Sequence, residues 1–152
     1  MKKITPFLWF NDQAEEAMRF YVSIFKDSKV IEVTPGPNGK AMGVRFELEG
    51  QEFMGLNAGP EFKFTEAISF YVSCKDQAEV DDLWAKLSAG AGEESRCGWV
   101  KDRFGLWWQV IPEALPKLMG DKDPVKAKRV VDAMLEMKKI DVAGLERAYE
   151  GR

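Results

Sequence analysis

The side chains available for chemistry form a restricted set, because the 152-residue chain contains no histidine. Serine and cysteine nucleophiles that depend on an imidazole base are therefore excluded. The lack of imidazole also excludes the usual ligand sets of non-haem iron and catalytic zinc. Of the two cysteines, Cys97 lies near Lys101 and Arg103, whose positive charges favour a thiolate. A small buried side chain on a strand is the more ordinary interpretation of Cys97, and also of Cys74.

The charge distribution argues against nucleic acid as a partner. The 22 Lys and Arg residues and the 25 Asp and Glu residues are interspersed, and the net charge is -3, so no basic stripe is available to follow a phosphate backbone. No apolar stretch is long enough to span a bilayer, and the N-terminal residues do not form a secretory hydrophobic region. Two cysteines are too few for a disulfide framework. We therefore expect a cytoplasmic protein with reduced thiols and no membrane partner.

A short motif occurs twice and indicates an internal duplication. The aromatic run at residues 7–10 is followed by Asp12-Gln13-Ala14-Glu15, and the run at residues 70–73 is followed by Asp76-Gln77-Ala78-Glu79. In each copy the aspartate is expected to cap a helix, and the glutamate three residues later to bond back to the cap. Apolar residues at helical spacing then predict helices over residues 13–25 and 77–88. We interpret both carboxylate pairs as helix starts rather than catalytic acids.

A clear alternation follows the first helix. Val44, Phe46 and Leu48 alternate with polar residues, which is the pattern of a half-buried strand. The intervening Arg45 and Glu47 are therefore expected on the face that points away from the packed helix.

Both halves are predicted to be βαβββ modules, which makes the fold class α+β. The remaining strands are expected at residues 30–34, 52–57, 98–103 and 106–111. We predict a single domain over residues 1–152, with module 1 at about 1–58, a linker at 59–66, module 2 at about 67–112 and a helical tail at 113–152.

The tail is predicted to contain helices with an apolar stripe. Asp123 and Asp141 are the expected N-caps, and Pro124 suits the first helical position. A tail of this length is too short to be a domain of its own, so its stripe must pack either on the sheet of its own chain or on a partner subunit. We expect a homodimer, because the stripe and the edges of two open sheets both need cover.

Three stretches carry a resemblance to known proteins. They are Ile-Thr-Pro-Phe-Leu-Trp-Phe at 4–10, Glu-Ala-Ile-Ser-Phe at 66–70, and Cys-Gly-Trp-Val-Lys-Asp-Arg-Phe-Gly at 97–105 running into Trp108-Gln109. Together with the tail from residue 123 to 145, they resemble the PhnB-like branch of the vicinal oxygen chelate superfamily, whose domains are described as 3-demethylubiquinone-9 3-methyltransferases. The superfamily also contains glyoxalase I, bleomycin-resistance proteins and extradiol dioxygenases. Trp107 departs from the branch pattern, in which a small residue such as Ser is usual.

The resemblance implies that the two modules form a glyoxalase/bleomycin-resistance-like cup that holds a ligand or metal. The positions that match the metal ligands of the superfamily's metalloenzymes are Thr5 or Pro6, Gly55, Ser69 and Gln109. Only Gln109 is a plausible ligand, because glycine has no side chain and serine is a poor neutral donor. An all-oxygen site would have to recruit Glu47 or Glu52. We therefore predict no metal and no cofactor.

The cup is expected to hold a planar or aromatic small molecule. The ligand-binding residues implied by strand periodicity and by the resemblance are Phe7, Trp9, Arg45, Asn57, Ser69, Tyr71, Trp107 and Gln109. An aromatic lining with a few polar anchors is the usual composition of a small-molecule site. The same rings would equally suit a filled interior with no cavity.

Three kinds of function remain open. The first is a metal-free protein that binds the compound, in the manner of the bleomycin-resistance relatives. The second is an enzyme, whether a lyase, an isomerase or the named methyltransferase, in which Arg45 or Gln109 polarises the compound and Glu47, Tyr71 or Cys97 moves protons. Methyl transfer gains no support from the residues, because no Rossmann-type glycine-rich start is present for S-adenosylmethionine. A structural or interaction role is the third.

Overall fold

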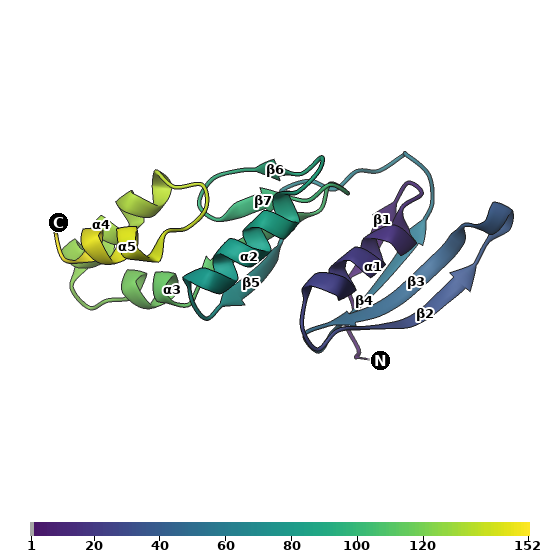
Figure 1. Ribbon diagram of the computed structural model, residues 1–152, viewed down its shortest axis with the longest axis horizontal. Helices are drawn as coiled ribbons and strands as arrows, with labels where there is room; N and C mark the ends of the chain where they lie inside the picture. Colours follow the sequence, from purple (N-terminus) through teal and green to yellow (C-terminus); the bar gives the residue numbers. More distant parts are fainter. Residues whose placement is uncertain (1) are drawn as a thin grey trace. The chain divides into compact units, whose positions relative to one another are not determined.

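A computed structural model describes residues 2–152. The chain divides into two compact units that are joined between Phe64 and Thr65, inside the predicted linker. Each unit contains a four-stranded sheet with a helix across one face, and the second unit also carries the C-terminal helices (Figure 1). The predicted α+β class, with its repeated βαβββ module, is confirmed.

The first unit contains one helix longer than a single turn. Its elements are β1 (Phe7–Phe10), α1 (Ala14–Ile24), β2 (Lys29–Pro35), the 3-10 turn η1 (Pro37–Gly39), β3 (Ala41–Leu48) and β4 (Gln51–Asn57). The strand order is β1-β4-β3-β2, with β1 parallel to β4 and the other pairs antiparallel.

The face of β3 under α1 is apolar, as the alternation predicts. The residues expected on this face, Val44, Phe46 and Leu48, are all buried. The Tyr21 ring of α1 lies 6.3 Å from that of Phe46, which stacks on Phe53 of β4 at 5.4 Å. Arg45 and Glu47 are half-buried on the opposite face, which is therefore the open face of the sheet.

The second unit repeats this topology. Its elements are β5 (Phe70–Cys74), α2 (Gln77–Ser88), β6 (Glu93–Glu94), β7 (Trp99–Lys101), β8 (Trp107–Pro112), α3 (Ala114–Met119), α4 (Pro124–Leu135) and α5 (Val142–Tyr149). The strand order is β5-β8-β7-β6, with β5 parallel to β8. The helix α2 buries Val80, Leu83, Trp84 and Leu87. The equivalent order of the two sheets agrees with a duplication.

A buried carboxylate organises the β7–β8 hairpin. Asp102 is 1% exposed. Its Oδ1 atom accepts hydrogen bonds from the main-chain N–H groups of Phe104 (2.9 Å) and Leu106 (3.0 Å), and its Oδ2 atom accepts one from the indole of Trp108 (2.9 Å). Part of the motif at residues 97–105 therefore serves the fold rather than a ligand.

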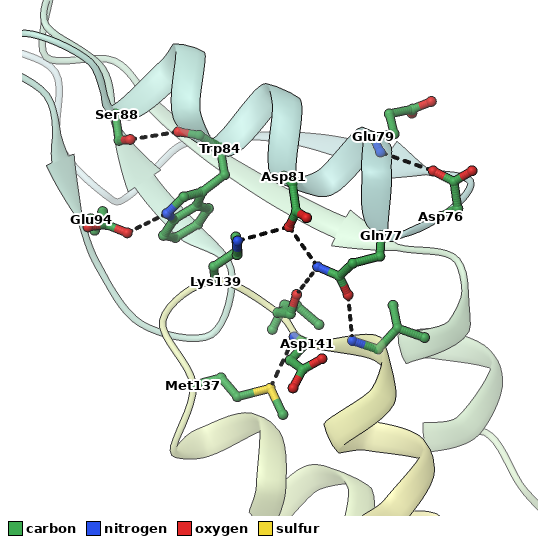
Figure 2. Close-up of polar contacts among 12 residues, drawn as sticks. Asp76, Gln77, Glu79, Asp81, Trp84, Ser88, Glu94, Met137, Lys139 and Asp141 are labelled. Atoms are coloured by element: carbon green, nitrogen blue, oxygen red, sulfur yellow. Dashed lines mark hydrogen bonds and ion pairs between the residues drawn. The ribbon is translucent and has the colours of Figure 1, made fainter.

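The cap of α2 forms as predicted. Asp76 precedes the helix, and its Oδ1 atom accepts a hydrogen bond from the N–H of Glu79 at 3.0 Å (Figure 2). This bond satisfies one of the N–H groups that the first turn leaves without a helical partner.

The first copy of the motif begins its helix differently, so the prediction for Asp12 was wrong. Gln13 occupies the cap position of α1 and makes no side-chain cap bond. Asp12 instead forms an ion pair with Lys40 at 3.2 Å. The N–H of Ala14 donates a hydrogen bond at 2.8 Å to Oδ1 of Asn57, the last residue of β4. A tertiary contact thus replaces the local cap.

The C-terminal helices pack on their own chain. Their apolar residues form one buried cluster with the end of β8, made up of Ile111, Leu115, Val130, Ile140 and Leu145. Of the two predicted destinations for the apolar stripe, the structure selects the sheet of the same chain. The helix α4 begins as predicted, with Pro124 in its first turn and Asp123 accepting from the N–H of Val125 at 2.9 Å.

A glutamine of α2 fastens the tail. Nε2 of Gln77 donates to the carbonyl oxygen of Ile140 at 3.0 Å, and Oε1 of Gln77 accepts from the N–H of Val142 at 2.7 Å (Figure 2). Lys139 pairs with Asp81 beside this contact, at 2.9 Å. Asp141 stands at the predicted cap position of α5 but makes no side-chain cap bond, and the N–H that is satisfied in the first turn by a side chain is that of Val142, through Gln77.

Candidate functional site

The open face of the second sheet brings three predicted ligand-binding residues, Tyr71, Trp107 and Gln109, together with Trp99 and Lys101. Gln109 on β8 lies between Tyr71 on β5 and Trp99 on β7, and Trp107 lies opposite Lys101. These residues alternate with buried residues that pack toward α2, so they share the opposite face. We call this group of five residues the aromatic face.

The amide of Gln109 is held in one orientation. Its Nε2 atom donates to Oγ of Ser69 at 2.9 Å, and both residues are half-buried. The structure thus brings together two residues that are 40 positions apart in the sequence. The amide oxygen of Gln109 is the group that remains to accept a hydrogen bond from a ligand.

Tyr71 presents an accessible ring. The residue is 54% exposed. Partial burial, and secondarily the neighbouring Cys74, raise the pKa of the Tyr71 hydroxyl above its ordinary value of 10.0. The hydroxyl is therefore neutral at physiological pH and can both donate and accept a hydrogen bond.

Trp107 is a buried member of the aromatic face and forms its floor. The residue is only 9% exposed. The Trp99 ring lies edge-on to it at 6.5 Å, and Nζ of Lys101 lies 5.9 Å from its ring centroid. Most of the ring is therefore already in contact with protein.

The predicted residues at the ends of β1 and β4 differ in exposure. Phe7 is 56% exposed. Trp9 is half-buried, and its indole donates to the carbonyl oxygen of Gly59 at 3.0 Å while its ring meets Phe62 edge-on at 4.9 Å. Both ends of the Asn57 amide bond to main-chain groups of the same unit. Of these three predicted residues, Phe7 has an exposed ring, Trp9 is bonded to main chain within its own unit, and Asn57 stabilises the fold through its two hydrogen bonds.

The open face of the first sheet carries a charged patch, made up of Lys29, Glu32, Arg45, Glu47 and Glu52. Arg45 lies 3.8 Å from Glu32 and 3.7 Å from Glu52, and Lys29 lies 3.6 Å from Glu47. Glu52 is only 8% exposed. Its Oε2 atom and the Nε atom of Arg45 are buried with no hydrogen-bond partner among residues 2–152.

The two cysteines occupy different environments. Cys97 lies in a turn with left-handed backbone (φ 58°) rather than on a strand as expected, and its N–H donates to the carbonyl oxygen of Met137 at 2.8 Å. Cys74 is fully buried at the end of β5. Burial first, and then the acidic residues around it, with Glu79 foremost, raise the pKa of the Cys74 thiol to about 12. Cys74 is therefore a neutral thiol and not a nucleophile.

The residues at the superfamily's metal positions do not fit a metal ion. Gly55 faces the packed core, because a Cβ atom there would lie 3.2 Å from Val44 and 3.3 Å from Phe10. This corrects the expectation that Gly55 lies at a ligand position of the cup. Ser69 is engaged by Gln109. Over residues 2–152, no three His, Cys, Asp or Glu side chains are grouped so that they could hold an ion.

Comparison with known proteins identifies the family. The family model described as 3-demethylubiquinone-9 3-methyltransferase matches residues 2–111. The chain belongs to this family. A structure described as a putative 3-demethylubiquinone-9 3-methyltransferase, PhnB protein, from Bacillus cereus shares 33% identity, with a TM-score of 0.69 over 73% of this chain and 99% of that chain. Protein PA1353 from Pseudomonas aeruginosa shares 22% identity, with a TM-score of 0.64 over 74% of this chain and 98% of that one.

These matches confirm the predicted resemblance to the PhnB-like branch and the glyoxalase/bleomycin-resistance type of fold. A structure described as a glyoxylase/bleomycin resistance protein/dioxygenase domain from Frankia sp. EAN1pec is more distantly similar to this chain, with 15% identity and a TM-score of 0.44 over 74% of this chain and 92% of that chain. No curated protein matches the chain. The family model ends at residue 111, so α3, α4, α5 and the likeness predicted for residues 123–145 lie outside it.

Two features of these surfaces escaped sequence analysis. Trp99 and Lys101 join the aromatic face because β7 pairs with β8 in this register, and their alternation with Val100 was the available signal. The deep burial of Glu52 had no signal, because it depends on which side chains lie over it. In the part of the chain that the structure describes, no helix is both long enough and apolar enough to cross a membrane.

Proposed function

We propose that this family member binds a planar, aromatic small molecule on the aromatic face of the second sheet. The observation that carries the proposal is the exposed Tyr71 ring beside Gln109, whose amide is fixed by Ser69 at 2.9 Å. An exposed ring next to an oriented hydrogen-bonding group is the combination that small-molecule sites use for affinity and orientation.

The strength expected of such a site is moderate. Aromatic contacts contribute roughly 0.5–1.5 kcal/mol each beyond the burial of area. Tyr71 and Trp99 provide ring surface, Trp107 lies beneath them, and Gln109 provides one hydrogen bond. With area burial included, a ligand of drug-like size would reach roughly micromolar affinity, or about −8 kcal/mol.

We further propose that binding needs neither metal nor cofactor. Gly55 has no side chain and faces the core, and Ser69 is a poor neutral donor that is already bonded to Gln109, which leaves Gln109 as the one competent ligand among these residues and supports this part of the proposal. Elemental analysis after mild purification is the test, and stoichiometric nickel, zinc or iron would contradict it.

The binding proposal is tested by screening planar aromatic compounds with tryptophan quenching and thermal shift. We expect Tyr71→Ala to weaken the best compound about tenfold, which corresponds to the loss of about 1.4 kcal/mol, and Tyr71→Phe to retain most of the affinity. Trp107→Ser should widen the floor and admit larger compounds while the fold remains. Ile68→Ala, at an apolar residue that is 59% exposed outside the strands, is the matched control. The proposal fails if no compound shifts the wild-type protein, or if Ile68→Ala is as damaging as Tyr71→Ala.

The description of the family favours a second candidate, an enzyme that acts on such a compound. Methyl transfer to a quinol is the reaction that the description names, and a lyase or isomerase would suit the same face. On that face Gln109 would polarise the compound and Tyr71 would move a proton. Mass spectrometry of a demethylated quinol incubated with the protein and S-adenosylmethionine separates the two candidates, because a binding protein returns the compound unchanged.

We also propose that the chain forms a homodimer. The edge strand β2 carries Val30 and Ile31, which are 36% and 37% exposed, and exposed edge strands are usually paired or covered. Sedimentation at micromolar concentration is expected to show a dimer, and a monomer alone would contradict this.

A further inference from the structure

The charged patch on the first sheet has an uncompensated negative charge. Glu47 on β3 and Glu52 on β4 are direct cross-strand neighbours, and like charges in such a pair repel one another. Lys29 approaches Glu47, but its side chain is 68% exposed, so solvent weakens its effect. The patch holds three carboxylates against two cations, which favours an incoming cation over an anion.

Glu52 is buried with too few partners. It is 8% exposed, and its Oε1 atom lies 3.7 Å from Nη2 of Arg45, which is too long for a hydrogen bond. Its Oε2 atom has no hydrogen-bond partner within residues 2–152. A buried carboxylate is costly unless it is both paired and hydrogen-bonded. Glu52 is therefore a strong acceptor whose capacity is unused.

Arg45 lies beside Glu52 without a hydrogen bond to it. Its guanidinium lies between Glu32 and Glu52 at 3.8 Å and 3.7 Å, and its Nε atom also has no partner in the described chain. The Arg45 side chain is 26% exposed and that of Glu32 is 58% exposed. Because Glu32 is a second partner for the guanidinium, Arg45 can turn toward it when a ligand approaches Glu52.

Apolar surface lies beside these charges. Met54 on β4 is the cross-strand neighbour of Arg45, and Phe7 on β1 is the neighbour of Met54. Phe7 is 56% exposed. Glu52 is two residues from Met54 on the same face of β4, a separation of about 7 Å. A ring placed on Phe7 and Met54 would therefore bring a short substituent to Glu52.

We propose that this patch binds the cationic end of an aromatic amine or amidine. The N–H groups of the ligand donate to Glu52, its ring lies on Phe7 and Met54, and Arg45 moves toward Glu32. All of its residues belong to the first unit, and the proposal does not rest on the function proposed above.

Benzamidine and benzamide test this proposal, because they share a shape and differ in charge. In calorimetric titration of the full chain, benzamidine is expected to bind about tenfold or more tightly than benzamide, as charge-assisted hydrogen bonds are the stronger kind. Glu52→Gln should remove that preference. Glu49→Gln, at an exposed glutamate of the β3–β4 turn, is the matched control and should keep it. Tyr71→Ala should also leave benzamidine binding unchanged, which separates this site from the aromatic face.

Arg45→Met provides a second test that does not depend on the stability of Glu52→Gln. Methionine keeps an apolar stem and removes the competing cation, so benzamidine should bind several-fold more tightly. If Arg45 were instead an anchor for an anion, benzoate would bind wild type better than benzamidine, and Arg45→Met would abolish that binding. Equal binding of benzamidine and benzamide, unchanged preference in Glu52→Gln, or displacement of benzamidine by stoichiometric Mg²⁺ or Ca²⁺ would each overturn the proposal.

Discussion

The two units have the same strand order but opposite kinds of open face. In the first unit, the centre of the face is a set of charges, with Glu52 buried beside Arg45. In the second, the centre is Gln109 between the rings of Tyr71 and Trp99. The faces that pack against helices are alike, since both are built from apolar residues. A duplicated module has therefore kept its core and diverged where the core places no constraint.

The N-termini of α1 and α2 also differ between the two units. The tetrapeptide is identical in the two units, yet Asp76 caps its helix and Asp12 does not. In the first unit a strand residue, Asn57, satisfies the N–H of Ala14. Identical local sequence thus leads to different contacts when the surroundings differ.

The largest expected effect concerns two glycines with left-handed backbone, one in each unit. A Cβ at Gly98 would lie 2.7 Å from Ile111 and 3.0 Å from the main chain of Val110, whereas a Cβ at Gly50 would meet nothing within 4 Å. Gly98→Ala should lower the free energy of unfolding by about 3 kcal/mol. Gly50→Ala should lower it by about 1 kcal/mol, the cost of the backbone alone. Urea denaturation measures both, and equal losses would show that Ile111 and the chain around it relax freely.

The next effect concerns the helix starts. Asn57→Ala removes two hydrogen bonds to main-chain groups and should cost about 2 kcal/mol of unfolding free energy. Asp76→Ala should cost about 1 kcal/mol. Asp12→Ala removes only an exposed ion pair and should cost less than about 0.5 kcal/mol. If Asp12→Ala and Asp76→Ala lowered the unfolding free energy equally, both aspartates would act as helix caps, which would contradict the structure.

The last effect is absent at neutral pH, appears only in alkali and concerns only the second unit, which holds both cysteines. The pKa of Cys74 is raised from 9.0 to about 12 in the folded chain, so the unfolded chain releases this proton first. The stabilisation is complete below about pH 9 and is lost progressively as the pH rises from about 9 toward 12. Cys74→Ala should flatten the decline of unfolding free energy between about pH 8 and 10. An identical slope in the variant would show that other groups cause it.

Periodicity was enough to predict the modules, because strands and helices impose their own spacing on apolar residues. The helix at residues 77–88 and the burial of Val44, Phe46 and Leu48 follow directly from this spacing. The sequence also pointed to Ser69, Tyr71 and Gln109, through strand alternation together with the family resemblance. These residues share one face, although their role in binding stays a proposal.

What escaped prediction depends on contacts between distant segments. Asn57 at α1 and Gln77 at α5 replace caps that local sequence assigned to Asp12 and Asp141. Gly55 faces the core because β4 pairs it with the buried Val44 of β3, a register that the family resemblance alone does not fix. The burial of Glu52 follows from its neighbours rather than from its own position in the strand.

The tail has a practical consequence for anyone who shortens this protein. The family model stops at residue 111, but Ile111 packs in one buried cluster with Leu115, Val130, Ile140 and Leu145, and Gln77 bonds to the start of α5. A chain trimmed at the family boundary would expose the inner side of that cluster to water and would leave the amide of Gln77 without its partners. We expect such a fragment to aggregate on expression, while the complete chain remains dispersed. The limit of a family is set by what relatives share, and the limit of a folding unit is set by what it buries.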